Sequence, residues 1–200
     1  MQIKISPGNV KMGRIPSISL PPVQTCRPDA PCTADCYARK AWRMYPSVRE
    51  AWQNNLTVYE EDPEIYFEQL HAVISKRNYP WFRFHVAGDF VDQEYFTRTL
   101  QLAKGLPGTK FLAFTKRFDY IEQRSSPVPE SLSIVLSMWP GLPSPGSDLN
   151  HFPRTWVRDP KNPDPRVPET AVPCPGHCDT CNLCWSLKLA GIKDVVFDKH

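Results

Sequence analysis

The stretch WFRFHVAGD (residues 81–89) decides the fold. Its aromatic and β-branched residues predict a buried strand over 81–86, and the Ala-Gly-Asp turn that follows stops it. Further short strands are predicted over 15–20, 110–114, 132–138 and 195–197. Because strands recur along the chain with helical patterns between them, the segments fit repeated strand–helix–strand units.

Two helices separate these strands. Asp62-Pro63-Glu64 predicts a helix start, with Asp as the N-cap, Pro in the first turn and an acid at the positive end of the dipole. A second helix is predicted over 92–104, ending at Gly105. Such units imply an α/β fold with a parallel sheet, which we expect to be a partial or distorted (βα) barrel whose strands end at one common face.

The chain is long enough for one domain with a small addition. We expect a βα core over 1–139, and a C-terminal cysteine-rich appendage over 140–200. Ten prolines within 140–175 predict an ordered wrapping segment or lid without regular structure. A helix over 185–190, capped by Gly191, would follow it. Trp42, Tyr45 and Trp52, at helical spacing, are expected in the core.

Composition narrows the classes of function. The net charge of +3 is too small to imply an electrostatic partner, so nucleic acid is neither indicated nor excluded. No apolar run is long enough for a secretory signal or a membrane span. Seven cysteines in such a chain suggest reducing cytoplasm, where thiols serve metals or chemistry rather than disulfides.

The first cysteine set is Cys26, Cys32 and Cys36, spaced C-x5-C-x3-C after a predicted strand. Three thiolates on one loop suit a [4Fe–4S] cluster with one iron open to an exogenous ligand. Zinc with a fourth ligand from elsewhere is the alternative. Three unrelated buried cysteines would be the plain structural interpretation, but the loop is polar and rich in turn formers.

The second set places four cysteines in eleven residues: Cys174, Cys178, Cys181 and Cys184. Zinc sites usually join two separated pairs, whereas short consecutive steps wrap one loop around a cluster. A closed [4Fe–4S] site is therefore favoured over zinc. His177 within this loop is interpreted as an exposed or supporting residue. Mixed ligation between the two sets stays open.

Other polar residues follow the predicted strands. Asp89 is either a cofactor contact or a turn former, and Thr115-Lys116-Arg117 could hold a carboxylate or phosphate or be a solvated basic turn. Ser137 is a candidate of the same kind. His85, inside a strand, is interpreted as a core residue rather than a ligand.

The chain resembles the phage gene-product-88 family. The resemblance rests on motifs along most of the chain: Pro7-Gly8-Asn9-x-Lys11-x-Gly13, Ser17-x-Ser19-Leu20-Pro21, Thr25-Cys26, Cys32, Cys36-Tyr37-Ala38, Ala87-Gly88-Asp89-Phe90, Phe114-Thr115-Lys116 and the C-terminal cysteine run. It implies a phage or prophage origin, and hence the host cytoplasm, but no reaction.

A more distant resemblance is to the partial barrel of radical SAM enzymes. It rests on the order of elements, which is a strand, a three-cysteine loop and a helix, followed by βα units. That resemblance implies an open cluster on the first set that binds S-adenosylmethionine (SAM). Gly88 and Asp89 would match the element that meets the methionine amino group, and the second set would match an auxiliary cluster. The cysteine spacing is wider than usual, Tyr37 follows the last cysteine, and one glycine precedes the acid. A sixth strand is reached only by assigning 155–157.

The sequence thus predicts an iron–sulfur protein of radical-SAM-like type, whose substrate is unknown and which would need an electron donor. Whether it is an enzyme stays open. The alternatives are a non-catalytic iron–sulfur protein, structural or redox-sensing, and a zinc-binding interaction module. Expected cofactor contacts are Gly88, Asp89, Thr115 and Lys116.

Overall fold

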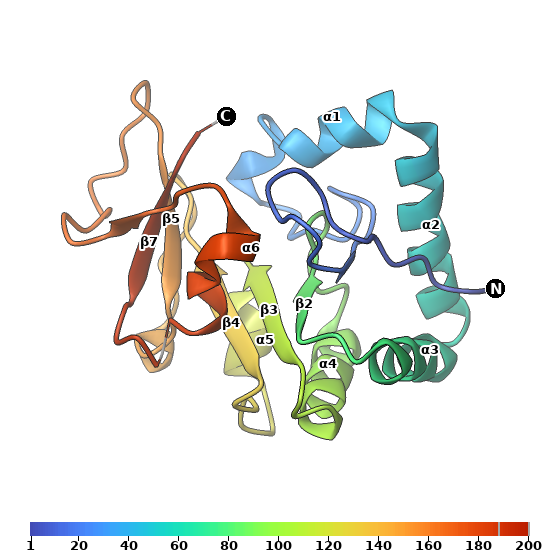
Figure 1. Ribbon diagram of the computed structural model, residues 1–200. Helices are drawn as coiled ribbons and strands as arrows, with labels where there is room; N and C mark the ends of the chain where they lie inside the picture. Colours follow the sequence, from blue (N-terminus) through green and yellow to red (C-terminus); the bar gives the residue numbers. More distant parts are fainter. Residues whose placement is uncertain (188, 200) are drawn as a thin grey trace.

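One sheet organises the chain. The computed structural model describes residues 1–187 and 189–199, and Figure 1 shows its strands side by side. They pair in the order β1-β2-β3-β4-β5-β7-β6, and every pair is parallel. The strands are β1 (Ser17–Ile18), β2 (Trp81–Phe84), β3 (Lys110–Thr115), β4 (Leu132–Ser137), β5 (Arg154–Arg158), β6 (Val172–Pro173) and β7 (Asp194–Asp198). The α/β class and the open parallel sheet are confirmed.

Helices connect the first strands. Their bounds are α1 (Tyr37–Met44), α2 (Pro46–Glu61), α3 (Pro63–Arg77), α4 (Gln93–Gly105), α5 (Phe118–Glu122) and the single turn α6 (Cys178–Cys181), with 3-10 turns at η1 (Pro31–Thr33), η2 (Ser147–Leu149) and η3 (Leu183–Trp185). The predicted start of α3 is confirmed, because the Asp62 carboxylate accepts hydrogen bonds from the backbone N–H groups of Glu64 and Ile65, both at 3.0 Å. Asp92 caps α4 in the same way through the N–H of Tyr95, at 2.7 Å.

Alternating side chains give the sheet two different faces. Phe82, Phe84 and Phe111 belong to the main core beneath the helices, together with Phe118 and Ile121 of α5. Leu112 of β3 and Val135 of β4 belong instead to a smaller cluster with Met12, Trp185 and Leu187. Figure 1 shows α6 lying over the face of β3 and β4 opposite α5. The sheet is therefore covered by helices on one face and by the two ends of the chain on the other.

The proline-rich segment is more regular than its composition predicts. The extra strand assigned to 155–157 is real and forms β5, while β6 and η2 also lie within 140–175. Most of these prolines lie outside the short elements, and Pro173 lies in β6 at the edge of the sheet, where a missing N–H costs little. The division at residue 139 stays a prediction, although segments on both sides of it contribute strands to one sheet.

Two other expectations are wrong. Instead of a helix over 185–190, the chain forms α6 and η3 earlier, since Asn182 adopts a left-handed conformation (φ 51°) that ends α6 after one turn; residue 188 lies outside the described residues. The Trp42 and Trp52 rings stack on each other with centroids 6.2 Å apart, but both are only half-buried, and Tyr45 is exposed. None of the described helices combines the length and hydropathy that a membrane crossing requires.

Candidate metal centres

The carboxyl ends of the first four strands carry the candidate polar residues. Gly88 and Asp89 follow β2, Thr115 ends β3 with Lys116 directly after it, and Ser137 ends β4. The loop after β1 joins them, because the N–H of Leu20 donates to the carbonyl of Ala87 at 3.0 Å. Parallel strands bring these ends to one edge, which is where α/β proteins gather their ligands.

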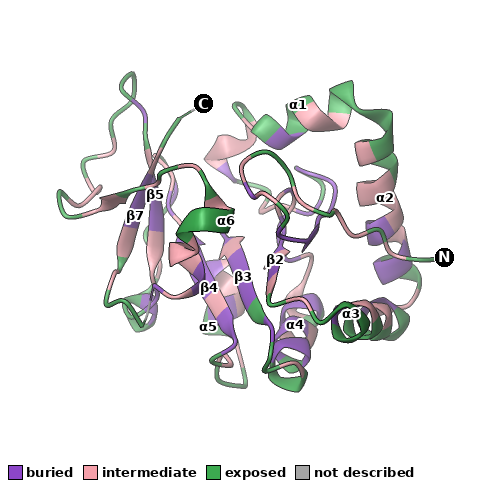
Figure 2. Ribbon diagram, in the orientation of Figure 1, coloured by how far each residue is buried: buried purple, intermediate pink, exposed green. Residues whose placement is uncertain are grey.

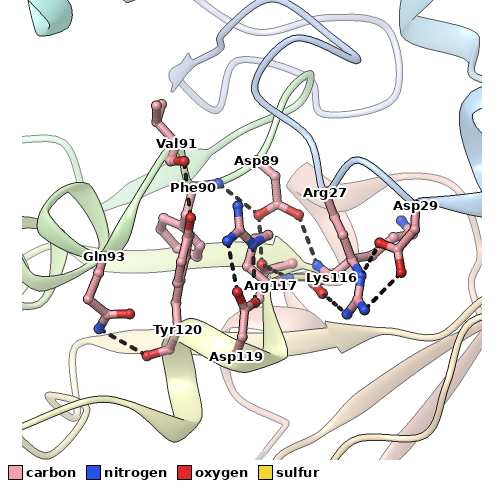
Figure 3. Close-up of polar contacts among 11 residues, drawn as sticks. Arg27, Asp29, Asp89, Phe90, Val91, Gln93, Lys116, Arg117, Asp119 and Tyr120 are labelled. Carbon is pink, nitrogen blue, oxygen red and sulfur yellow. Dashed lines mark hydrogen bonds and ion pairs between the residues drawn. The ribbon is translucent and has the colours of Figure 1, made fainter.

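Asp89 ties this edge together (Figure 3). Its Oδ1 accepts hydrogen bonds from the Thr115 hydroxyl at 2.6 Å and from the N–H of Phe90 at 2.8 Å, while its Oδ2 accepts from the N–H of Lys116 at 2.9 Å. Burial nevertheless raises the pKa of this carboxyl above its usual value, because three donors only partly replace the lost water. The Asp89 carboxylate and the Thr115 hydroxyl are thus hydrogen-bonded to each other. One acceptor position on Asp89 Oδ2 has no donor among the described residues.

Gly88 allows the β1 loop to approach. Its φ is +79°, and a Cβ at this position would lie 2.5 Å from the Thr25 hydroxyl and 2.9 Å from Leu20 Cβ. Thr25 in turn donates to the carbonyl of Pro21 at 2.9 Å and accepts from the N–H of Asp89 at 3.4 Å. Only glycine combines this conformation with so close a contact, so Gly88 fixes the position of the residue that precedes Cys26.

The first cysteine set lies against this edge. Cys26 follows Thr25, Cys32 is in η1 and Cys36 is the N-cap of α1, and all three are partly buried and free of disulfides. Burial raises the pKa of the Cys26 thiol to about 12, and Asp89, Cys32 and Cys36 act in the same direction. Deprotonation of the Cys26 thiol is therefore disfavoured by its burial and by nearby groups that are acidic or become negative.

Tyr37 fastens the loop from the other side. Its hydroxyl donates to the carbonyl of Val86, at the end of β2, although its ring is 58% exposed. Because Tyr37 is the first residue of α1, this bond holds the N-terminus of the helix, and with it Cys36, against the sheet.

A cation stands beside the first set. The Lys116 ammonium donates to the Ser137 hydroxyl at 3.0 Å and lies 5.7 Å from the centre of the Trp139 ring. Its neighbours Arg27 and Arg117 are each paired with an acid, Asp29 and Asp119 respectively. Within residues 1–187 and 189–199, Lys116 forms no ion pair, so its charge is available to an anionic ligand.

The second cysteine set lies on the opposite face of the sheet. The N–H of Cys174 donates to the carbonyl of Val196 in β7 at 2.8 Å, and the N–H of Cys178 donates to the carbonyl of Lys11 at 2.9 Å. The carbonyl of Cys184 accepts from the Ser133 hydroxyl of β4 at 2.7 Å. Cys174, Cys178 and Cys184 pack against the smaller apolar cluster, whereas Cys181 is exposed. His177 is exposed, as expected.

Arg83 on β2 supplies positive charge to this set. It opposes the burial that raises the pKa values of Cys178 and Cys184, the latter to about 12. Its guanidinium lies 4.7 Å from the centre of the Phe114 ring, and Nη1 approaches Met12 Sδ at 3.6 Å. Nε is buried without a partner among the described residues. The positive charge of the Arg83 guanidinium is therefore only partly compensated by its described neighbours. Such a charge would stabilise a neighbouring site that becomes negative when cysteine thiolates bind a metal group.

Neither set is arranged around a single ion. Among the side chains that the structure describes, no three of His, Cys, Asp or Glu could hold one metal ion. Tetrahedral zinc with Zn–S bonds of about 2.3 Å would need sulfurs about 3.8 Å apart. A four-iron cluster binds each thiolate through a different iron and therefore accepts a wider spacing.

The sequence profile of the family described as Gene product 88 matches residues 4–139. The chain belongs to the gene product 88 family. The match includes Cys26, Cys32, Cys36 and the strand-edge residues, and it ends before the second cysteine set. No curated protein and no solved structure matches the chain, so the likeness of this gene product 88 member to radical SAM enzymes stays an expectation.

Several expected residues meet in space, and others were missed. Gly88, Asp89, Thr115 and Lys116 lie together at the carboxyl edge, and their role as cofactor contacts stays a prediction. His85 is a buried core residue that hydrogen-bonds Tyr95 at 3.2 Å. Arg83 was missed, although a lone charge within WFRFHV was a signal that the second face of β2 meets something polar.

Proposed function

We propose that this gene product 88 protein is an iron–sulfur protein with two [4Fe–4S] sites. Cys26, Cys32 and Cys36 hold an open-site cluster at the carboxyl edge of the sheet. The four C-terminal cysteines hold a closed one on its other face. The observation that carries the proposal is the position of the loop that bears three partly buried thiols. It contacts the turn at Gly88, beside a lysine that forms no ion pair within the described residues.

The open site suits a small ligand with an amino and a carboxylate group, which is the chemistry of SAM. A four-iron cluster held by three thiolates leaves one iron free to bind such a ligand and can supply one electron. Lys116 is placed to attract the carboxylate, since its present partners Ser137 and Trp139 are both neutral. The remaining acceptor position on Asp89 Oδ2 is suited to an ammonium group.

The closed site is assigned a supporting role. Three of its four cysteines, Cys174, Cys178 and Cys184, pack against the apolar cluster that covers β3 and β4, and Arg83 and Lys11 provide the nearby positive charge. Buried positive charge favours the more negative, reduced state of a cluster, so this site suits electron storage or relay.

One observation favours the non-catalytic alternative. Three donors already occupy the Asp89 carboxylate, which therefore positions the Cys26 loop whether or not a ligand binds. In that case both clusters would be structural or redox-sensing, and the edge residues would serve only to hold the loop.

Anaerobic reconstitution with iron and sulfide separates these possibilities. Two four-iron clusters predict about eight iron and eight sulfide per chain. A change in the EPR spectrum of the reduced protein on adding SAM, with release of 5′-deoxyadenosine, would support the open-site function. An unchanged spectrum would support the non-catalytic alternative. Stoichiometric zinc without visible absorbance would overturn the iron–sulfur proposal.

Two matched triple variants test the division of cysteines. Replacing Cys26, Cys32 and Cys36 by Ala should halve the iron and abolish the response to SAM. Replacing Cys178, Cys181 and Cys184 by Ala should also halve the iron but keep the response. Complete loss of iron in either variant, or no loss, would refute the three-plus-four assignment.

A further inference from the structure

One corner of the structure carries a local excess of positive charge. Residues 37–49, which comprise α1, Tyr45 and the start of α2 and are called the α1–α2 corner below, contain four basic residues and no acid: Arg39, Lys40, Arg43 and Arg49. The whole chain carries +3, so the other 187 residues together carry −1. The small net charge of the whole chain therefore conceals a local excess of positive charge, which would attract a large anion.

This corner stands away from the core. Ala38 is the only buried residue of α1, and all four cations of the corner are exposed. Figure 2 shows α1 as mostly exposed or half-buried ribbon at the rim of the molecule, with α2 leading back toward α3. Arg39 donates to the carbonyl of Thr33 at 3.0 Å. Within the described chain, none of the four cations is ion-paired, so no acid neutralises them.

Aromatic rings lie among these cations. Tyr37 and Tyr45 are 58% and 53% exposed as whole residues, which is far more than core residues show. Trp42 and Trp52 stack half-buried beside them, with an interplanar angle of 25°. Exposed rings interleaved with arginine and lysine provide flat surfaces for bases and charges for phosphates.

We propose that the α1–α2 corner binds single-stranded nucleic acid. A single strand offers unpaired bases that can stack on exposed rings, whereas a duplex keeps its base faces covered. The corner, residues 37–49, contains no acid that would bind a basic peptide. This surface adjoins the first cysteine set, because Tyr37 follows Cys36 and Arg39 donates to Thr33, but the proposal does not rest on the proposed iron–sulfur function.

The proposal has a measurable salt dependence. If all four cations contact phosphates, the slope of log K against log salt for a single strand is about −3. Removing two of them should bring the slope to about half that value. Loss of one stacking ring should weaken binding by about tenfold.

Fluorescence anisotropy of a labelled 20-mer of deoxythymidine, titrated with the full chain, tests it. Lys40→Ala combined with Arg43→Ala should weaken binding and flatten the salt slope, and Tyr45→Ala should weaken binding while preserving the slope. Lys76→Ala combined with Arg77→Ala is the matched control, because it removes an exposed lysine and arginine from α3 and should leave binding unchanged.

Three outcomes would overturn the proposal. Equal loss of binding in the control would show that charge alone, and not this corner, is responsible. Tighter binding of a duplex of the same sequence would exclude single-strand recognition. Displacement of the oligonucleotide by polyglutamate at matched charge concentration would show plain anion exchange. Circular dichroism of each variant confirms that a loss of binding is not a loss of fold.

Discussion

Acid should destabilise this protein through one histidine. His85 is buried at the end of β2, where its Nε2 meets the Tyr95 hydroxyl at 3.2 Å and its Nδ1 has no partner among the described residues. Burial, assisted by the charge of Arg83, lowers its pKa from 6.5 to about 3. The folded state therefore holds this imidazole neutral at pH values where the unfolded chain protonates it.

The direction follows from proton binding. Between pH 6.5 and about 3 the unfolded state binds more protons at this site, so the free energy of unfolding falls as the pH falls. The slope approaches about 1.4 kcal/mol per pH unit well below pH 6.5, and the change from pH 6.5 to 4.5 removes about 2.3 kcal/mol. Above about pH 7.5 the contribution of His85 is nearly constant.

Urea unfolding, followed by circular dichroism at pH 7.5, 6.5, 5.5 and 4.5, measures this slope. His85→Asn suits the left-handed backbone there (φ 54°) and removes the titrating group. The variant should be less stable than the wild type at pH 7.5 but lose about 3 kcal/mol less on acidification. His151→Asn, at an exposed histidine, should keep the wild-type slope. Parallel curves for wild type and His85→Asn would refute the reasoning.

Three further substitutions test how the strand edge and α3 are built. Asp89→Ala leaves two backbone donors and a hydroxyl without their acceptor, and we expect a loss of about 2–4 kcal/mol in urea unfolding; Glu94→Ala, which removes only an exposed ion pair, should cost less than about 0.5 kcal/mol. Gly88→Ala should cost at least about 1–2 kcal/mol from its left-handed backbone alone, whereas Gly105→Ala, with open space at its Cβ, should be neutral or stabilising in the same assay. Asp62→Ala should lower stability by about 1 kcal/mol through loss of the α3 cap, and an unchanged unfolding midpoint would contradict that role.

The structural features that the sequence predicted correctly are mostly those that depend on residues close to one another in the chain. The N-cap at Asp62 was visible in the sequence because its partners lie two and three residues away. The strand over 81–86 was visible because aromatic and branched residues favour a pleated surface. The convergence of Asp89 with Thr115 and Lys116 followed from the rule that parallel strands end at one edge.

Contacts between distant segments were not predictable in this way. The indole N–H of Trp185 donates to the carbonyl of Phe82 at 3.4 Å across 103 residues, and Ser133 bonds Cys184 across 51. No local sequence pattern around these residues indicates their partners. The burial of the second cysteine set against the sheet therefore could not be predicted from the cysteine spacing. Helical spacing also misplaced Trp42 and Trp52, because a periodic apolar stripe does not reveal whether a second layer covers it.

The covering of β3 and β4 by both chain ends has a consequence for synthesis. Leu112 and Val135 are made long before Trp185 and Leu187, which bury them. A ribosome-bound chain that has reached residue 139 therefore carries a sheet with one apolar face still open to water. The last sixty or so residues act as an internal cover, and a fragment that stops at the edge of the family match should aggregate unless a chaperone shields that face.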